Sequence, residues 1–230
     1  MTTSRTGGNV MRADGRRILV GALLVGLSGL ASLTACQSEP SQDGVANTDR
    51  FLSQINVGEF DYDPFSSPDE MAKAATLIVR GKVLDLVAGR AFREPKSELA
   101  DITTGVFQIE VTEVLGGRLA EGSDGMVYIE EFGVQEPEQV AANMPKGADV
   151  LLYLVPAPDA PPIPGAEIID DGAGVAPGQH LYQQVNPQGF YMDIGSDVAQ
   201  VVGGEVYKDS SLSQFEPGND SFPGTPVRTE

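Results

Sequence analysis

Two residue types suited to nucleophilic or acid–base chemistry occur once each in this 230-residue chain, as Cys36 and His180. A Ser-His-Asp or Cys-His site needs the base beside its nucleophile. His180 instead lies in a Pro/Gly-rich stretch, residues 176–181, and the chain has no G-x-S-x-G turn. A zinc site needs three or four clustered His or Cys ligands. The sequence therefore predicts no catalytic residue, no zinc site and no cofactor.

Carboxylates are the other source of chemistry, since the chain has 33 Asp and Glu residues. Calcium needs only oxygen ligands, and the acidic clusters at 61–63, 167–171 and 193–197 are candidates, although none has EF-hand spacing. Paired carboxylates could act as in a glycosidase, but no spacing singles out a pair and there is no Trp to stack on a sugar. The glycine-rich stretch 172–178 lacks the Lys and Ser/Thr of a phosphate loop. We interpret these clusters as solvated loops without a metal.

The position of Cys36 is more informative than its chemistry alone. Three arginines at residues 12–17 precede an uncharged apolar run at 18–33, which is short for a bilayer span of about 20 residues. A basic start followed by such a run is typical of an export signal. The run ends in Leu33-Thr34-Ala35-Cys36, which resembles the lipobox of bacterial lipoproteins, where an aliphatic and two small residues precede the cysteine.

This resemblance implies that residues 1–35 are a signal peptide cut between Ala35 and Cys36. It also implies a diacylglyceryl group on the Cys36 thiol, with a further acyl group on the new amino terminus as an option. Two acyl chains give lasting attachment to a membrane. The alternatives are a secretory signal with an incidental cysteine and an uncleaved anchor helix. The true start, Met1 or Met11, and the choice between inner and outer membrane stay open.

The charge changes sign at the same place. Four arginines and one aspartate precede Cys36, so the rest of the chain carries 11 basic and 32 acidic residues. A surface this acidic repels phosphate backbones and lacks the basic patch that nucleic-acid binding needs. We expect no nucleic-acid partner. The expected partners are the membrane, through the lipid on Cys36, and an envelope protein or small ligand of unknown identity.

The elements that would position any site are mostly short strands. We expect a flexible tether at 36–66, then a β domain at 67–207 and a disordered tail at 208–230. The apolar residues of the tether, from 51 to 65, either pack on the domain as a leading arm or form a partner-binding segment. A helix is predicted from Ser67, an N-cap followed by Pro68. Alternation of apolar and polar residues indicates about six or seven strands. The strand at 149–155 is apolar on both faces, so we expect it to be central.

The order of a helix and then "LIVRGKV", "VFQIEVTEVLGG", "GMVYIEEF" and "KGADVLLYLVPAP" is similar to the OB-like barrels of the netrin and metalloproteinase-inhibitor class. The predicted fold is therefore mainly β, a small antiparallel barrel (OB-like) or sandwich with one or two short helices. The proline-rich loop at 156–178 is long for a connection between strands, which favours either a passive loop or a binding element.

The predicted function rests on the lipid anchor at Cys36 and on the lack of a recognisable set of catalytic residues in the sequence. The sequence predicts a lipid-anchored protein of the cell membrane that faces outside the cytoplasm and acts as a non-enzymatic binding or interaction module. A carboxylate-dependent hydrolase of the cell envelope and a calcium-stabilised adhesion module are the alternatives.

Overall fold

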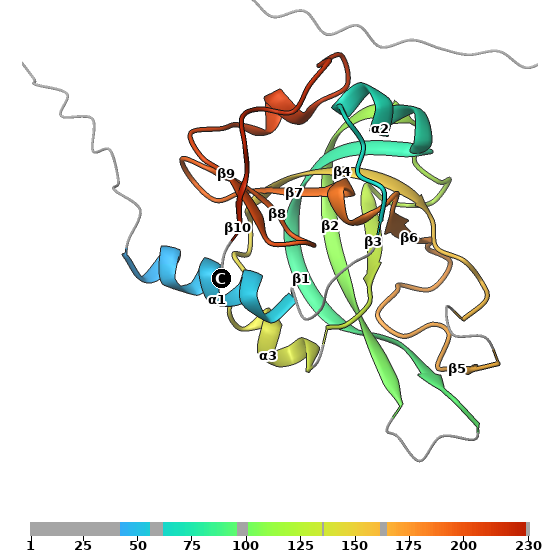
Figure 1. Ribbon diagram of the computed structural model, residues 1–230. Coiled ribbons are helices and arrows are strands. Elements are labelled where there is room, and N and C mark those ends of the chain that lie inside the picture. The colour runs from blue at the N-terminus through green and yellow to red at the C-terminus, as the bar shows by residue number, and fades with distance from the viewer. Residues whose placement is uncertain (1–41, 56–61, 96–100, 135, 162–164, 229–230) are drawn as a thin grey trace, which may run out of the picture. The chain divides into compact units, whose positions relative to one another are not determined.

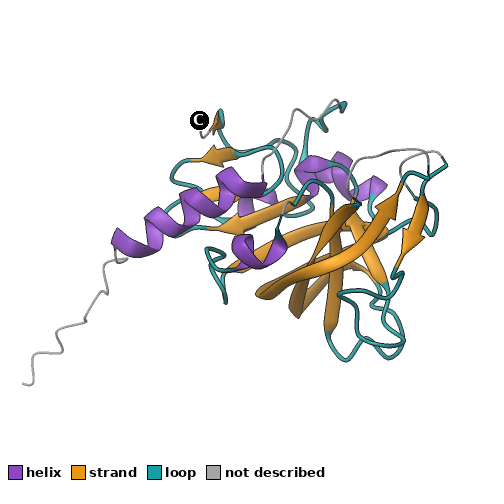
Figure 2. Cartoon of the chain, turned by 90° about the horizontal axis from the view of Figure 1, so that it is seen from below, coloured by secondary structure: helices purple, strands orange, loops and turns teal. Residues whose placement is uncertain are grey.

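The computed structural model describes residues 42–55, 62–95, 101–134, 136–161 and 165–228, and these form a mainly β unit, as the sequence predicted. Figure 2 shows the strands with the helices beside them. The helices are α1 (Gln42–Ile55), α2 (Pro68–Ala74) and α3 (Pro137–Ala141), with 3-10 turns η1 (Pro187–Gly189) and η2 (Leu212–Phe215). The strands are β1 (Leu77–Arg93), β2 (Ile102–Gly117), β3 (Met126–Glu131), β4 (Asp149–Pro156), β5 (Glu167–Ile169), β6 (Leu181–Gln184), β7 (Phe190–Asp193), β8 (Val198–Gln200), β9 (Glu205–Tyr207) and β10 (Val227–Arg228).

Hydrogen bonds join five of these strands into a closed ring. β1 pairs with β2, β2 with β3, β3 with β6, β6 with β4, and β4 pairs again with β1. Within this ring only β3 and β6 run parallel to each other, and the other four pairs are antiparallel as predicted. A closed five-stranded ring corresponds to the OB-like alternative of the predicted fold.

The described residues hold more strands than the six or seven predicted, because the sheet continues outside the ring. One edge of β4 pairs with β7 and then with β6, and η1 lies between these two partners in sequence. From β7 the sheet runs on through β8 and β9 to β10. The strands that were not predicted, β5, β9 and β10, are two or three residues long. Such short segments give little alternation to read from a sequence.

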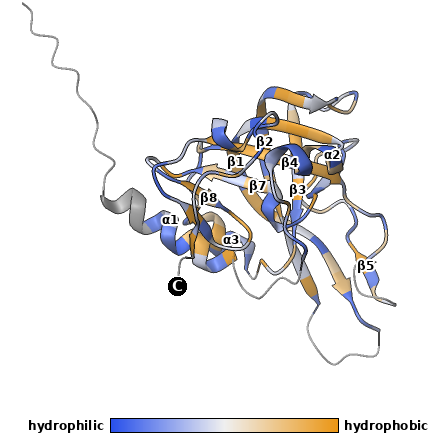
Figure 3. Ribbon diagram, turned by 45° about the horizontal axis from the view of Figure 1, so that its top comes forward, coloured by the Kyte–Doolittle hydropathy of each residue, from blue (hydrophilic) through white to orange (hydrophobic). Residues whose placement is uncertain are grey.

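Strand β4 is central, as its apolar pattern predicted, and it separates two hydrophobic cores. Val150, Leu152 and Leu154 belong to the core inside the ring. Leu151 and Tyr153 belong to a second core on the outer face. Figure 3 shows apolar residues along β1, β2 and β4. Both faces of β4 are buried because each one meets a different set of covering elements, which explains a continuous apolar run instead of alternation.

Helix α1 corrects the expected tether at 36–66. Phe51, Leu52 and Ile55 are buried in the core of the ring, and the Phe51 ring meets Phe107 edge to face at 6.3 Å. The apolar residues that open the predicted arm therefore do pack on the domain, but as a helix that begins at Gln42. Helix α1 was not predicted from the local sequence, because the first half of its sequence is polar. Its apolar positions stabilise the helix only through tertiary packing.

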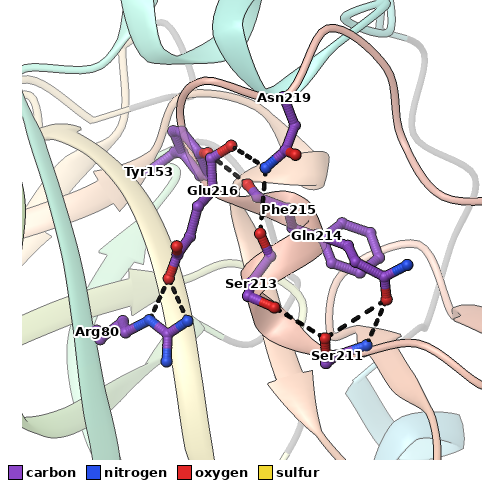
Figure 4. Close-up of polar contacts among 8 residues, drawn as sticks. All are labelled: Arg80, Tyr153, Ser211, Ser213, Gln214, Phe215, Glu216 and Asn219. Carbon is purple, nitrogen blue, oxygen red and sulfur yellow. Dashed lines mark hydrogen bonds and ion pairs between the residues drawn. The ribbon is translucent and has the colours of Figure 1, made fainter.

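The C-terminal segment corrects the expected disorder at 208–230. Phe215 in η2 is fully buried in the outer core, and the Tyr153 hydroxyl donates a 2.5 Å hydrogen bond to its carbonyl oxygen. Glu216 pairs with Arg80 of β1, and the Asn219 side chain donates to the carbonyl oxygen of Glu216 (Figure 4). The Ser, Pro and Gly content that suggested disorder serves turns that bring these few anchoring residues onto the sheet.

Helix α2 begins as predicted. Ser67 is its N-cap, Pro68 occupies the first turn, and the Ser67 hydroxyl accepts a 3.1 Å hydrogen bond from the Glu70 amide. None of the helices in the described ranges is long and apolar enough to cross a membrane.

The longest strands, β1 and β2, extend past the ring as a hairpin, seen at the bottom of Figure 1. The short β5 joins the far end of β1, where Ala91 pairs with Ile169. The loop from β4 to β6 is thereby fixed beside the hairpin, and the surface between them carries the candidate site.

Candidate binding cavity

A cavity of about 630 Å³ lies within the connection from β4 to β6 and reaches the outer face of β1. Its lining includes Arg90 of β1 and both ends of the connection, from Pro156 to Leu181. The apolar part of the wall consists of Pro156, Ala157, Val175, Ala176, Pro177 and Leu181. The polar part consists of Arg90, Asp159, Asp171, Gln179 and His180. The long loop that the sequence left between a passive and a binding role therefore forms most of a cavity.

Arg90, at the inner wall of this cavity, is buried and forms an ion pair with Glu130 of β3. The Arg90 Nε donates a 2.8 Å hydrogen bond to Glu130 Oε1, and Nη2 donates to Oε2. The Thr104 hydroxyl of β2 lies 3.1 Å from Glu130 Oε1 and 3.1 Å from the Arg90 carbonyl oxygen, so it can donate to either. One polar row thus crosses the outer faces of three neighbouring strands.

The same guanidinium ties the sheet to the loop above it. Arg90 Nη1 donates a 3.1 Å hydrogen bond to the carbonyl oxygen of Pro158 and lies 3.7 Å from Asp171 Oδ1. Its carbon Cζ is 5.6 Å from the centre of the Phe92 ring. Hydrogen bonding to Glu130 raises the pKa of Arg90 above its ordinary value, while burial opposes that change. Each buried charge of the pair has a partner of opposite sign and further hydrogen bonds that compensate for its removal from water.

The far wall of the cavity is packed against the sheet at Gly174. Its φ is +78°, and a Cβ built there would lie 2.8 Å from the Ala88 carbonyl oxygen and 2.9 Å from Val106 Cβ. A larger residue would have to push the turn off β1 and β2. Turns on either side, closed by hydrogen bonds from the Ala173 amide to Asp170 and from the Gln179 amide to Ala176, hold the rest of this wall.

A second buried carboxylate, Glu131, lies next to this site but on the opposite face of β3. Its register partner is Gly105, and it shares the inward orientation of Ile129 in the ring core. The Gln184 side chain of β6 donates to it a 2.6 Å hydrogen bond. Burial raises the pKa of Glu131 to about 7, and this effect exceeds the opposing effect of the Gln184 hydrogen bond. Glu131 therefore changes its charge in the neutral pH range.

The predicted site residues fall in three places. His180 and Asp171 come together at the cavity, although neither was expected to meet Arg90. In the acidic cluster at 193–197, Asp193 accepts a hydrogen bond from the Gly195 amide and Asp197 is paired with Lys208, so protein groups already occupy these carboxylates. Ala35 and Cys36 lie outside the described residues, as does Asp61.

Within the described ranges no three His, Cys, Asp or Glu side chains gather as ligands for a metal ion. The residues that sequence reasoning missed are Arg90, Thr104, Glu130 and Glu131. A signal for two of them was present, because adjacent glutamates at the end of an apolar strand must point to opposite faces. When both faces are covered, both carboxylates are buried.

No protein-family model, curated protein or solved structure matches the chain. The site must therefore be interpreted from its own chemistry. The volume of the cavity lies within the range of about 300–1,000 Å³ that is usual for small-ligand sites.

Proposed function

We propose that the chain is a lipid-anchored extracytoplasmic protein of the cell envelope, whose β domain is a non-enzymatic binding module. The Leu33-Thr34-Ala35-Cys36 sequence after a basic and an apolar segment supports the anchor. The observation that carries the binding role is the cavity of about 630 Å³ between the β4–β6 connection and Arg90. The expected occupant is a small ligand or a protruding group of an envelope protein.

Helix α1 shortens the segment that can act as a tether after Cys36. The helix begins at Gln42, so residues 37–41 are the only ones between the lipid on Cys36 and the start of the folded chain. Five residues span at most about 18 Å when fully extended. The proposed lipid and the start of α1 are then separated by no more than this length, and the acidic charge of the chain after Cys36 opposes tight contact with anionic head groups.

Metabolic labelling with a fatty acid tests the anchor directly. The wild-type chain should carry the label and the Cys36→Ser variant should not. Ser28→Ala is a matched control, because it changes a small residue of the same signal segment and leaves the proposed lipid site intact. Equal labelling of wild type and Cys36→Ser would show that the anchor is assigned to the wrong residue.

The non-enzymatic role is supported by the bonding of the buried carboxylate nearest the cavity. Glu130 accepts hydrogen bonds from Arg90 on both carboxylate oxygens, so protein groups already occupy this carboxylate. Crosslinking in the native cell, with the crosslinker placed at the exposed residue 176, should recover a bound partner or ligand.

Turnover of cell-wall glycans by residues 37–230, abolished by Asp171→Asn, would instead establish the hydrolase. A rise in melting temperature with millimolar calcium would support the adhesion module.

A further inference from the structure

The charge of Arg90 does not make the cavity an anion site, because that charge is already matched. Glu130 accepts hydrogen bonds from two of its nitrogens, and the third nitrogen donates to the carbonyl oxygen of Pro158. An anion entering the cavity would have to displace buried partners from Arg90. Breaking such a buried pair is unfavourable, since it leaves the Glu130 carboxylate without compensation.

The charges that remain in the lining are negative. Asp159 and Asp171 are both exposed, and Asp171 keeps 79% of its side-chain surface accessible while its Oδ1 lies 3.7 Å from Arg90 Nη1. Glu130, behind the lining, compensates the charge of Arg90, so the uncompensated carboxylates of the lining are those of Asp159 and Asp171. A concave surface lined by one sign of charge concentrates ions of the opposite sign.

The other wall of the cavity is apolar. Pro156, Val175, Pro177 and Leu181 face the same space as the two carboxylates. Prolines give this wall a fixed shape, so little conformational freedom is lost when a ligand packs on it. An occupant that fits both walls has a positively charged head and a short apolar body.

We infer that the cavity binds a primary ammonium or guanidinium group attached to a short apolar chain, with the charge held between Asp159 and Asp171. This inference rests on the proposed binding role of the same cavity. The group can come from a free amine or from a lysine or arginine side chain of a protein, because both present the same chemistry.

Titration by nuclear magnetic resonance with residues 37–230 tests this inference, since that chain contains the compact unit Ser38–Glu230. The probes are n-butylammonium, n-butyrate and n-butanol, which share a chain and differ in charge. Butylammonium should shift the amide signals of residues 157–159 and 171–181 in a saturable manner, and butyrate should not. Nα-acetyl-lysine N-methylamide distinguishes the sources: tighter binding than butylammonium points to a protein side chain, and weaker binding points to a small amine.

Asp171→Asn and Asp159→Asn should each weaken butylammonium binding by about fivefold, the upper range for one partly exposed ion pair. Asp170→Asn is the matched control, because Asp170 is adjacent and exposed, lies outside the lining, and has a φ of +55° that asparagine tolerates. If Asp170→Asn weakens butylammonium binding equally, the effect comes from the general negative charge of the surface, and the inference is wrong.

Two further outcomes separate this inference from the proposed function. Saturable binding of butanol or butyrate in place of butylammonium would keep the cavity as a binding site and refute its preference for cations. If none of the three probes shifts the lining residues, the inference is wrong, and the binding role of the cavity is decided separately by the crosslinking experiment at residue 176.

Discussion

Replacing Glu131 by glutamine should change how the stability of the domain depends on pH. The Glu131 side chain is inside the ring, only 4% of its surface is accessible, and its pKa is raised from 4.5 to about 7 by burial. Between these two pH values the folded chain keeps a proton that the unfolded chain has released. The free energy of unfolding therefore falls as pH rises from 4.5 to 7 and is constant above that range as far as this group is concerned.

The magnitude follows from the two pKa values. A tenfold change in proton affinity corresponds to about 1.4 kcal/mol, so a pKa raised from 4.5 to about 7 lowers stability by about 3 kcal/mol at pH 8. Glutamine has the same shape and cannot ionise, and its amide oxygen can still accept the hydrogen bond from Gln184. The Glu131→Gln variant should therefore match the wild type near pH 4.5 and exceed its stability at pH 8 by up to about 3 kcal/mol.

Urea denaturation of the wild type and the variant between pH 4.5 and 8.5 measures this difference. Other carboxylates act in the opposite direction, since the pKa values of Asp85 and Asp197 are lowered and favour the folded state as pH rises. Their contributions cancel when the two curves are subtracted. Glu113→Gln, at an exposed position of β2, is the control and should give a flat difference. A flat difference for Glu131→Gln as well would refute the argument, and so would lower stability of this variant at pH 8.

Three further substitutions test the packing. Arg90→Met should lower the free energy of unfolding by about 3–5 kcal/mol, because it leaves the buried Glu130 carboxylate without its partner. Arg93→Met is the control: it breaks an exposed pair with Asp101 and should lower the free energy of unfolding by less than about 1 kcal/mol. Urea denaturation at pH 7 compares them, and equal losses would contradict the buried pair. Phe51→Ala should lower the free energy of unfolding by about 3–5 kcal/mol in the same assay, because α1 belongs to the core. An unchanged urea midpoint would show that residues 42–55 are part of a tether and not of the core. Phe215→Ala should destabilise by a similar amount and expose residues 208–222 to proteolysis, and protection equal to that of the wild type would show that η2 does not depend on this anchor.

The sequence alone determined the features that depend on local order. The mainly β class, the cap of α2 at Ser67 and the central position of β4 follow from alternation, turn residues and capping chemistry over a few neighbouring positions. The proposed signal region also rests on local order alone, because its basic, apolar and small residues are contiguous. The proposal for Cys36 therefore needs no tertiary information.

Tertiary structure alone decided which polar residues meet. Arg90 and Glu130 are 40 positions apart in sequence, and Arg90 lies at a register irregularity of β1 between Ala88 and Ala91. Likewise, only packing shows that Phe51 and Phe215, at opposite ends of the domain, are core residues instead of parts of a tether and a tail. Burial and pairing depend on contacts between distant segments, and the propensities of single segments do not contain that information.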